Sequence, residues 1–351
     1  MFKLNQKQQK IIGILLEKEK MQSSDVHREM VKIGEAVSLV TIKRILSGMA
    51  NHEVLIMTGL GRSTSYSLSS RGRFFSDIDA KKYIAIEPDK RYGLHQYNFN
   101  LLKSLPSNIF TDDEQKKLET WTAEYRRRTA NLSETIQKKE LERLVIELSW
   151  KSSRIEGNTY TLLDTEKLIL ENKEARGHSK KEAQMILNHK DAFHYIKKFS
   201  MQFRTVTRKN LEELHAILVK DLSVALGLRT KPVGVTGSMY RPLDNQYQIG
   251  EALDELSAVV SGLSTPYAQA LIVLLAISYI QPFEDGNKRT ARLMANALLV
   301  AHSLAPLSYR SVEEEDFLFA TMVFYELNSI MPMKRIFIDQ YAFAAQNYAV
   351  K

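Results

Sequence analysis

The stretch QPFEDGNKRTAR, residues 281–292, decides which fold is expected for the C-terminal part of this chain. It follows the apolar run ALIVLLAISYI at 270–280, which predicts a buried helix, and Pro282 predicts that this helix ends there. The Asp-Gly-Asn sequence at 285–287 favours a tight turn, because Gly and Asn tolerate positive φ. A second helix is expected to begin near Asn287, so the stretch predicts a loop that joins two helices.

Three cations gather at the start of that second helix: Lys288, Arg289 and Arg292. Backbone N–H groups at a helix start are unpaired, so together with these cations they favour a polyanion. Arg289 and Arg292 are three residues apart and share a helix face, which suits two successive phosphates of one nucleotide. Asp285 is placed to hold Mg²⁺ beside bound phosphates. A helix cap with cations on its surface is the structural alternative for the same residues.

The stretch resembles the signature of the Fic family, HxFx(D/E)GN(G/K)RxxR. The positions that match are Phe283, Asp285, Gly286, Asn287, Lys288, Arg289 and Arg292, and Gln281 stands in place of the leading His. A second motif, SSRIEGN at 152–158, resembles the family's inhibitory pattern (S/T)xxxE(G/N) through Ser152, Glu156 and Gly157. With further similarities at NHKDAFHYI, LEELHAIL and VGVTGSMYRP, the resemblance covers roughly residues 95–345 and points to the class that carries an inhibitory helix.

Fic proteins mostly transfer AMP from ATP to a hydroxyl side chain of a target protein, so the resemblance implies ATP as substrate with Mg²⁺. It implies that Asp285 holds the metal between the α- and β-phosphates. The residues implied to bind the nucleotide are Gly286, Asn287 and Lys288 at the loop and helix start, Arg289 at the β-phosphate and Arg292 at the γ-phosphate. Residues 232–243, with Val235, Thr236 and Gly237, are implied to be a flap with a short β-hairpin that pairs with the target backbone.

The resemblance also implies autoinhibition by Glu156. In the family this glutamate forms a salt bridge with the second arginine of the signature, here Arg292, and so denies the γ-phosphate its partner. Replacement of Glu156 by Gly is therefore expected to favour productive nucleotide binding.

Gln281 stands where the family has its general base. A glutamine amide cannot take a proton near pH 7, and loss of a general base costs roughly 10²- to 10⁴-fold in rate. Three explanations remain open: the glutamine was introduced to trap a substrate, it is natural in a nucleotide-sensing regulator, or another group acts as base. No histidine elsewhere in the chain is predicted to be that base.

The sequence therefore supports a protein adenylyltransferase scaffold, autoinhibited by Glu156 and impaired by Gln281. The first alternative is a catalytically silent, nucleotide-responsive DNA-binding regulator. Lys288 supports a third reading, because a lysine at that position also occurs in the related Doc toxins, which transfer the γ-phosphate to a target.

The first 75 residues resemble a winged helix-turn-helix. Three helical patterns are followed by VLIMTG and TSYSLS, which predict a hairpin around the turn LGRS. The third helix is expected to turn Val40, Ile42, Ile45 and Leu46 inward. If the segment binds DNA, the contacts would come from Ser38, Thr41, Lys43, Arg44 and Arg62. The segment holds twelve Lys and Arg against six Asp and Glu, and this positive charge suggests a module that faces a polyanion. The alternative to DNA binding is that the winged helix mediates protein contacts or packs on the rest of the chain.

The predicted domains are a winged helix at 1–75, a connector at 76–110 and a Fic-like helical domain at 111–351. The helical patterns run over 112–130, 132–154, 161–172, 179–199, 207–225, 248–263, 265–280, 287–303, 312–328 and 333–348. The expected fold is thus mainly α, with the small hairpin of the flap and the N-terminal winged helix.

The bulk composition excludes several classes of protein. The chain has 351 residues, a net charge of +8 and no cysteine, so disulfides and thiolate chemistry are excluded. Its longest apolar run is about half the roughly 20 residues needed to cross a bilayer, so no membrane partner is expected. The N-terminus lacks a secretory pattern, which favours the cytoplasm. The sequence leaves a homo-oligomer open.

Overall fold

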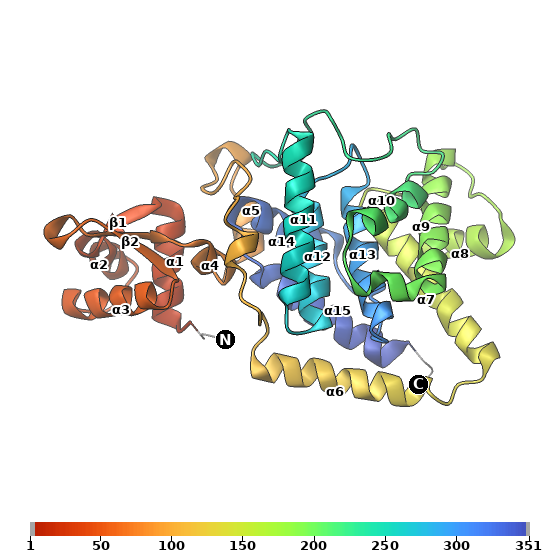
Figure 1. Ribbon diagram of the computed structural model, residues 1–351, viewed down its shortest axis with the longest axis horizontal. Coiled ribbons are helices and arrows are strands. Elements are labelled where there is room, and N and C mark those ends of the chain that lie inside the picture. Colours follow the sequence, from red (N-terminus) through yellow and green to blue (C-terminus); the bar gives the residue numbers. More distant parts are fainter. Residues whose placement is uncertain (1–3, 349–351) are drawn as a thin grey trace. The chain divides into compact units, whose positions relative to one another are not determined.

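A computed structural model describes residues 4–348 of the chain (Figure 1). The chain divides into two compact units. The first unit contains the residues up to Pro106 together with 235–241 and 319–333, and the second contains 107–234, 242–318 and the residues from Lys334 on. The predicted division into three consecutive domains missed this arrangement, because two short segments from the C-terminal half fold with the N-terminal third.

Residues 4–69, which we call the N-terminal module, form three helices and a small sheet. The elements are α1 (Gln6–Lys18), β1 (Lys20–Gln22), α2 (Ser23–Lys32), α3 (Leu39–Asn51), β2 (Leu55–Thr58), the 3₁₀ turn η1 (Gly61–Ser63) and β3 (Ser65–Leu68). The three predicted helices and the hairpin are confirmed. The sheet is antiparallel with the order β1-β3-β2. Strand β1 was not predicted, since its three residues are too few to show an alternating pattern.

The core of the N-terminal module corrects one detail of the prediction for α3. Ile42, Leu46 and Met49 are fully buried and follow the helical spacing of one face. Val40 was expected on that face but is 78% exposed. It lies two residues before Ile42, which is about 200° around the helix axis, so it faces solvent.

The rest of the first unit consists of short helices, residues 235–241 of the flap and the segment 319–333. The short helices are α4 (Ser70–Phe74), α5 (Ala80–Ile84), η2 (Pro88–Lys90) and η3 (Leu102–Ser104). The β-hairpin predicted within 232–243 does not form. Residues 235–238 make a turn instead, in which the Ser238 N–H donates to the Val235 carbonyl at 3.2 Å and Gly237 has a φ of +75°. Arg241 makes only an isolated parallel bridge with Gln96.

The remaining helices confirm the predicted mainly α fold. They are α6 (Asp112–Thr129), α7 (Glu134–Arg154), α8 (Leu162–Glu171), α9 (Lys180–Lys198), η4 (Ser200–Arg204), α10 (Arg208–Leu218), α11 (Gln246–Gly262), α12 (Pro266–Ile280), α13 (Asn287–Ala301), α14 (Glu314–Leu327) and α15 (Met331–Asn347). The helix predicted over 207–225 ends early at Leu218, because Asp221 and Ser223 adopt a positive φ. Within residues 4–348, none of these helices has the length and apolarity that a membrane crossing requires.

Helix α12 forms the centre of the second unit. Nearly all of its side chains are buried, and it packs against α11 and α13 (Figure 1). A helix that is apolar all round is stable only when other helices surround it. This packing fixes the end of α12 and the start of α13, and therefore the loop between them.

Candidate functional site

The loop between α12 and α13 depends on two residues in the left-handed region. Gln281, the last residue to cap α12, has a φ of 52° and a ψ of 59°. Gly286, just before α13, has a φ of 82°, and a Cβ added there would lie 3.1 Å from Cγ1 of Val219. Glycine is therefore required at 286 both by backbone conformation and by space.

The side chains of Gln281 and Asn287 hold the loop together. The Gln281 amide donates to the Ser278 carbonyl at 2.6 Å and accepts from the Asn287 amide at 3.0 Å. Asn287 also accepts from the Phe283 N–H and donates to the Phe283 carbonyl, both at 2.8 Å. Both amide groups are thus engaged within the loop, so in this conformation the Asn287 side chain stabilises the loop itself.

The start of α13 and the two signature arginines form an electropositive site. Among residues 4–348, no side chain caps α13, and its first intrahelical N–H bond is made by Thr290. The amides of 287–289 are therefore available to an anion. Arg289 and Arg292 are buried, and in the described part of the chain their Nη1 atoms have no hydrogen-bond partner. Such unsatisfied buried donors are costly, and an anionic ligand would satisfy them.

Glu156 contacts two of the cations at this site. Its carboxylate lies 2.9 Å from Nη2 of Arg292 and 3.1 Å from Nζ of Lys288. Burial by itself would raise the pKa of Glu156, but Arg292 and Lys288 outweigh burial and hold the pKa below its usual range. The carboxylate is therefore ionised at neutral pH. The family resemblance implied only Arg292 as the partner of Glu156. The contact with Lys288 is seen in the structure and was not predicted.

Ser152 and His189 support Arg292 from the other side. The Ser152 hydroxyl accepts from Nε of Arg292 at 2.9 Å, and the Ser152 carbonyl accepts from Nη2 at 2.8 Å. The same hydroxyl lies 2.9 Å from Nε2 of His189 on α9. Burial lowers the pKa of His189 to about 3, so the imidazole is neutral. Helix α7 ends two residues before Glu156, and Gly157 has a φ of 88°, which turns the chain after it.

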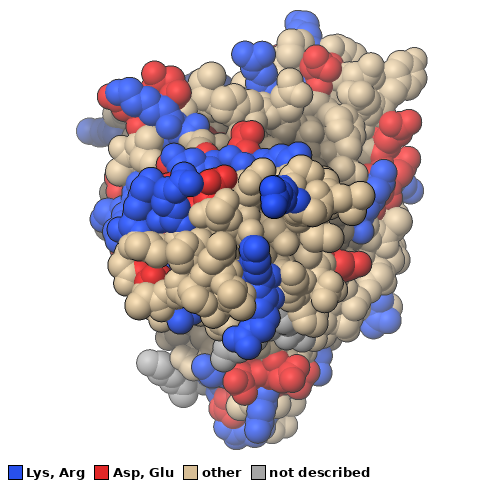
Figure 2. Space-filling model, turned by 90° about the vertical axis from the view of Figure 1, so that its left-hand side faces the viewer, with Lys and Arg blue, Asp and Glu red and all other residues tan. Residues whose placement is uncertain are grey.

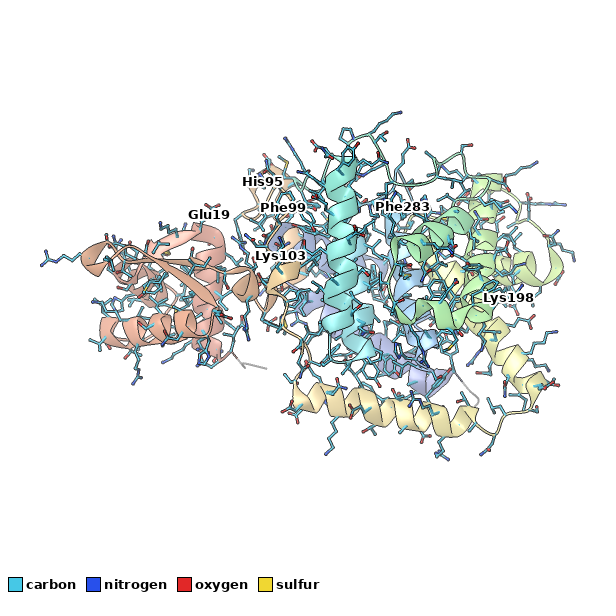
Figure 3. All side chains as sticks on the ribbon, viewed as in Figure 1. Glu19, His95, Phe99, Lys103, Lys198 and Phe283 are labelled. Carbon is cyan, nitrogen blue, oxygen red and sulfur yellow. The ribbon has the colours of Figure 1, made fainter. Side chains whose placement is uncertain are left out.

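His215 on α10 fixes the acidic end of the loop. Its Nε2 lies 2.9 Å from the carbonyl oxygen of Asp285, and its ring stacks on Phe283 at 3.7 Å (Phe283 is labelled in Figure 3). Burial lowers the pKa of His215, so it is neutral and donates one N–H to that carbonyl. The role of this histidine was not predicted, although the similarity at LEELHAIL had singled out its surroundings.

Arg229 is a second residue that the sequence did not reveal. It is buried, and its guanidinium donates to the carbonyl oxygens of Gln281 (2.6 Å), Lys231 (2.9 Å) and Leu243. Its cation lies at the C-terminal end of α12, where the helix dipole favours positive charge. Nothing in the local sequence signals this contact, which spans 52 residues.

The acidic residue of the loop is compatible with a metal ion that arrives with a nucleotide. Asp285 is 57% exposed, and it accepts from the Gly286 N–H at 2.6 Å and lies 3.4 Å from Nη2 of Arg289. Within residues 4–348, no group of three or more His, Asp or Glu side chains is arranged to hold a metal. Mg²⁺ needs no such group, because it often uses one or two carboxylates, waters and the phosphates of the substrate. Asp285 would supply that carboxylate.

The remaining predicted residues belong to the first unit. Val235, Thr236 and Gly237 belong to the first unit, whereas Gly234 and the signature belong to the second. Ser38, Lys43, Arg44 and Arg62 are exposed on the N-terminal module, and Thr41 is half-buried. The Ser38 hydroxyl accepts from the Thr41 N–H at 3.2 Å and caps α3.

Comparison with known families gives a match for the part of the chain that carries the signature. Residues 205–299 match the family described as Fic/DOC, so this part of the chain is similar to that family.

Curated relatives extend the similarity. The chain is 27% identical over 172 residues to the protein adenylyltransferase Fic of Nematostella vectensis, which covers 48% of this chain and 40% of that protein. It is 30% identical over 161 residues to the protein adenylyltransferase Fic of Drosophila willistoni, which covers 45% of this chain and 32% of that protein. The chain thus matches less than half the length of either relative.

Solved structures share the fold. Fic-1 of C. elegans (residues 134–508) superposes with a TM-score of 0.55 at 19% identity, covering 67% of this chain and 71% of that one. A Fic domain containing signaling protein from Bacteroides thetaiotaomicron superposes with a TM-score of 0.54 at 20% identity, covering 66% of this chain and 94% of that one.

Proposed function

We propose that this chain is a Fic-type protein adenylyltransferase that Glu156 holds in an inhibited state and that lacks an efficient general base. The observation that carries the proposal is the contact of Glu156 with Arg292 and Lys288, beside arginine donors that have no partner among residues 4–348. The carboxylate occupies the cations that a triphosphate would need. The named relatives are adenylyltransferases, which agrees with this reading.

The proposed reaction is attack of a target hydroxyl oxygen on the α-phosphorus of ATP. The bond to the β-phosphate oxygen breaks, pyrophosphate leaves, and the hydroxyl proton must go to a base. The amides at the start of α13 would bind the α-phosphate, and Arg289 and Arg292 would bind the outer phosphates and stabilise developing charge. Mg²⁺ held by Asp285 would add positive charge between the phosphates. Gln281 cannot take the proton, so this step is expected to be slow.

The position of the label in ATP distinguishes transfer of AMP from transfer of the γ-phosphate. The Glu156→Gly chain is incubated with ATP labelled at either the α- or the γ-phosphate, with Mg²⁺ and a cell extract as the source of targets. We expect label on protein only from the α-position, because the γ-phosphate leaves in pyrophosphate. Label from the γ-position would instead establish Doc-like phosphate transfer. Binding of ATP without either label would support the silent regulator.

We also propose that the reaction takes place in the cytoplasm, where ATP is available.

We also propose that the N-terminal module is a winged helix that binds DNA. Its three helices and antiparallel sheet occur in the order of that fold, with η1 at the wing tip. Helix α3 has no acidic residue, and its exposed Lys43 and Arg44 lie together with Val40 and Ser47 at helical spacing. Figure 2 shows the face on the side of the N-terminal module, where Lys and Arg form separate groups interrupted by Asp and Glu. The positive charge of this face is therefore moderate. Because the proposed contacts join Lys and Arg to phosphates, the binding is expected to be sensitive to salt.

A gel-shift series at increasing salt measures this second function. The Lys43→Ala, Arg44→Ala double variant is expected to bind more weakly and to reduce the slope of log affinity against log salt by about 2, since two phosphate contacts are lost. The matched control is the Lys7→Ala, Lys18→Ala double variant of α1, which loses the same charge. Its slope of log affinity against log salt is expected to change much less than that of the α3 variant. Equal effects of the two pairs would indicate attraction by net charge alone and would reject α3 as the DNA-binding helix.

A further inference from the structure

The C-terminal end of α14 belongs to the first unit and has two faces with different neighbours. Val323 and Leu327 are completely buried in one hydrophobic cluster that joins Ile42 and Leu46 of the N-terminal module to Ile78 and Tyr83 of the segment after it. These two α14 residues are four apart, so they share one face of the helix. This face anchors α14 in the cluster.

The other face of α14 holds the flap. Tyr325 stacks on Tyr240 with the ring centroids 5.5 Å apart, and both side chains are buried. One residue later, Glu326 accepts a hydrogen bond from the Ser238 hydroxyl. A single helix turn therefore belongs to the hydrophobic cluster of the N-terminal module through Val323 and Leu327 and contacts the flap through Tyr325 and Glu326.

A buried ion pair fixes Glu326. Its carboxylate lies 3.1 Å from Nη1 of Arg91, and these side chains are only 4% and 5% exposed. The same Nη1 donates to the Gly237 carbonyl at 3.0 Å, and the Tyr83 hydroxyl donates to Glu326 at 2.8 Å. A charge buried in this way is costly without its partner, so these contacts form or break together.

We propose that Glu326 is a positioning residue for the flap and that, through α14, it couples the flap to the N-terminal module. Opening of the module would release residues 237–241, and any ligand that stabilises the module would hold them in place. In the proposed transferase, Val235 to Gly237 meet the target, so the module would regulate target binding. That consequence rests on the proposed function, whereas the coupling itself does not.

Amide hydrogen exchange of the full chain tests the coupling without nucleotide or target. The readout is the Arg241 N–H, which donates to the carbonyl of His95 at 2.8 Å (His95 is labelled in Figure 3). Leu46→Ala leaves a cavity in the core of the N-terminal module and is expected to speed exchange at Arg241 by about tenfold or more. The Thr290 N–H in the second unit serves as the internal reference and is expected to keep its rate.

A matched control is Leu256→Ala, which removes an equally buried leucine from α11 in the second unit. It is expected to leave the exchange of Arg241 unchanged. Unchanged exchange at Arg241 in Leu46→Ala would overturn the proposal, even if the module itself had unfolded. An equal acceleration at Arg241 and Thr290 would also overturn it, since that result means a general loss of stability.

Ser238→Ala removes the link to Glu326, together with the bond that the Ser238 hydroxyl accepts from the Tyr240 N–H at 3.1 Å. It leaves the Arg91–Glu326 pair and the core of the N-terminal module intact, so amides within α3 should exchange at their usual rate. Exchange at Arg241 is expected to rise by about tenfold, because the hydroxyl that fastens the flap to α14 is gone. No rise at Arg241 would show that Ser238 does not transmit the position of Glu326.

A functional measurement separates this proposal from that of the transferase. In a chain with Gln281→His and Glu156→Gly, Ser238→Ala is expected to lower the labelling of target proteins while the ATP affinity stays the same. A loss of ATP affinity would assign Ser238 to the nucleotide site and contradict a flap role. Absence of labelling in the parent chain would reject the transferase and leave the exchange results to decide the coupling.

Discussion

A chain that carries both Gln281→His and Glu156→Gly is expected to transfer AMP about 10²- to 10⁴-fold faster than one that carries Glu156→Gly alone. The reason is the missing proton acceptor. An imidazole has a pKa near neutrality and can take the proton of the attacking hydroxyl, whereas the Gln281 amide cannot. The Glu156→Gly change is included in both chains so that nucleotide binding is the same and only the base differs.

The structure also defines what the histidine must replace. Gln281 bonds the Ser278 carbonyl and the Asn287 amide, so any substitution loosens the loop to some extent. The contact of Arg229 with the Gln281 carbonyl involves only the backbone and is expected to persist.

Gln281→Ala is therefore the control, because it removes the same amide bonds and supplies no base. Transfer is measured as label from α-labelled ATP on protein over time. A Gln281→Ala chain that is as fast as Gln281→His would show that release of the amide, and not a base, limits the rate. Rapid transfer with Gln281 in place would show that another group accepts the proton.

The second large effect concerns nucleotide affinity. Glu156→Gly is expected to raise the affinity for ATP by roughly 10- to 100-fold, since bonds to charged groups contribute about 1.5–3 kcal/mol and every 1.4 kcal/mol is tenfold. The change frees both Arg292 and Lys288 from the carboxylate. AMP lacks the outer phosphates that these cations would bind, so its affinity is expected to change little.

Calorimetry with ATP, ADP and AMP in the presence of Mg²⁺ measures this difference. Glu156→Gln is the matched variant, because it keeps the size of the side chain and removes the charge without adding glycine flexibility beside Gly157. A similar gain for ATP in both variants would attribute the effect to charge. An equal gain for AMP and ATP would contradict competition between the carboxylate and the outer phosphates.

Much of this site could be read from local sequence. The apolar run before Pro282 gave the buried helix α12, and the Asp-Gly-Asn turn with its cations gave the start of α13. The resemblance to the family motif implied that Glu156 lies beside Arg292, and the structure has them 2.9 Å apart. Less could be predicted for the flap. Two valines and two glycines favoured a β-hairpin there, but the chain forms a turn instead.

The sequence by itself determined most of the helices, the hairpin of strands β2 and β3 and the loop at 281–286, because periodicity, caps and glycine conformation act over a few residues. Tertiary structure alone decided that Lys288 joins Arg292 on Glu156, that His189 supports Ser152, and that Arg229 holds the end of α12. It also decided that residues 235–241 of the flap fold with the first unit. These contacts join residues far apart in the chain, and they depend on how the helices pack, which no local pattern records.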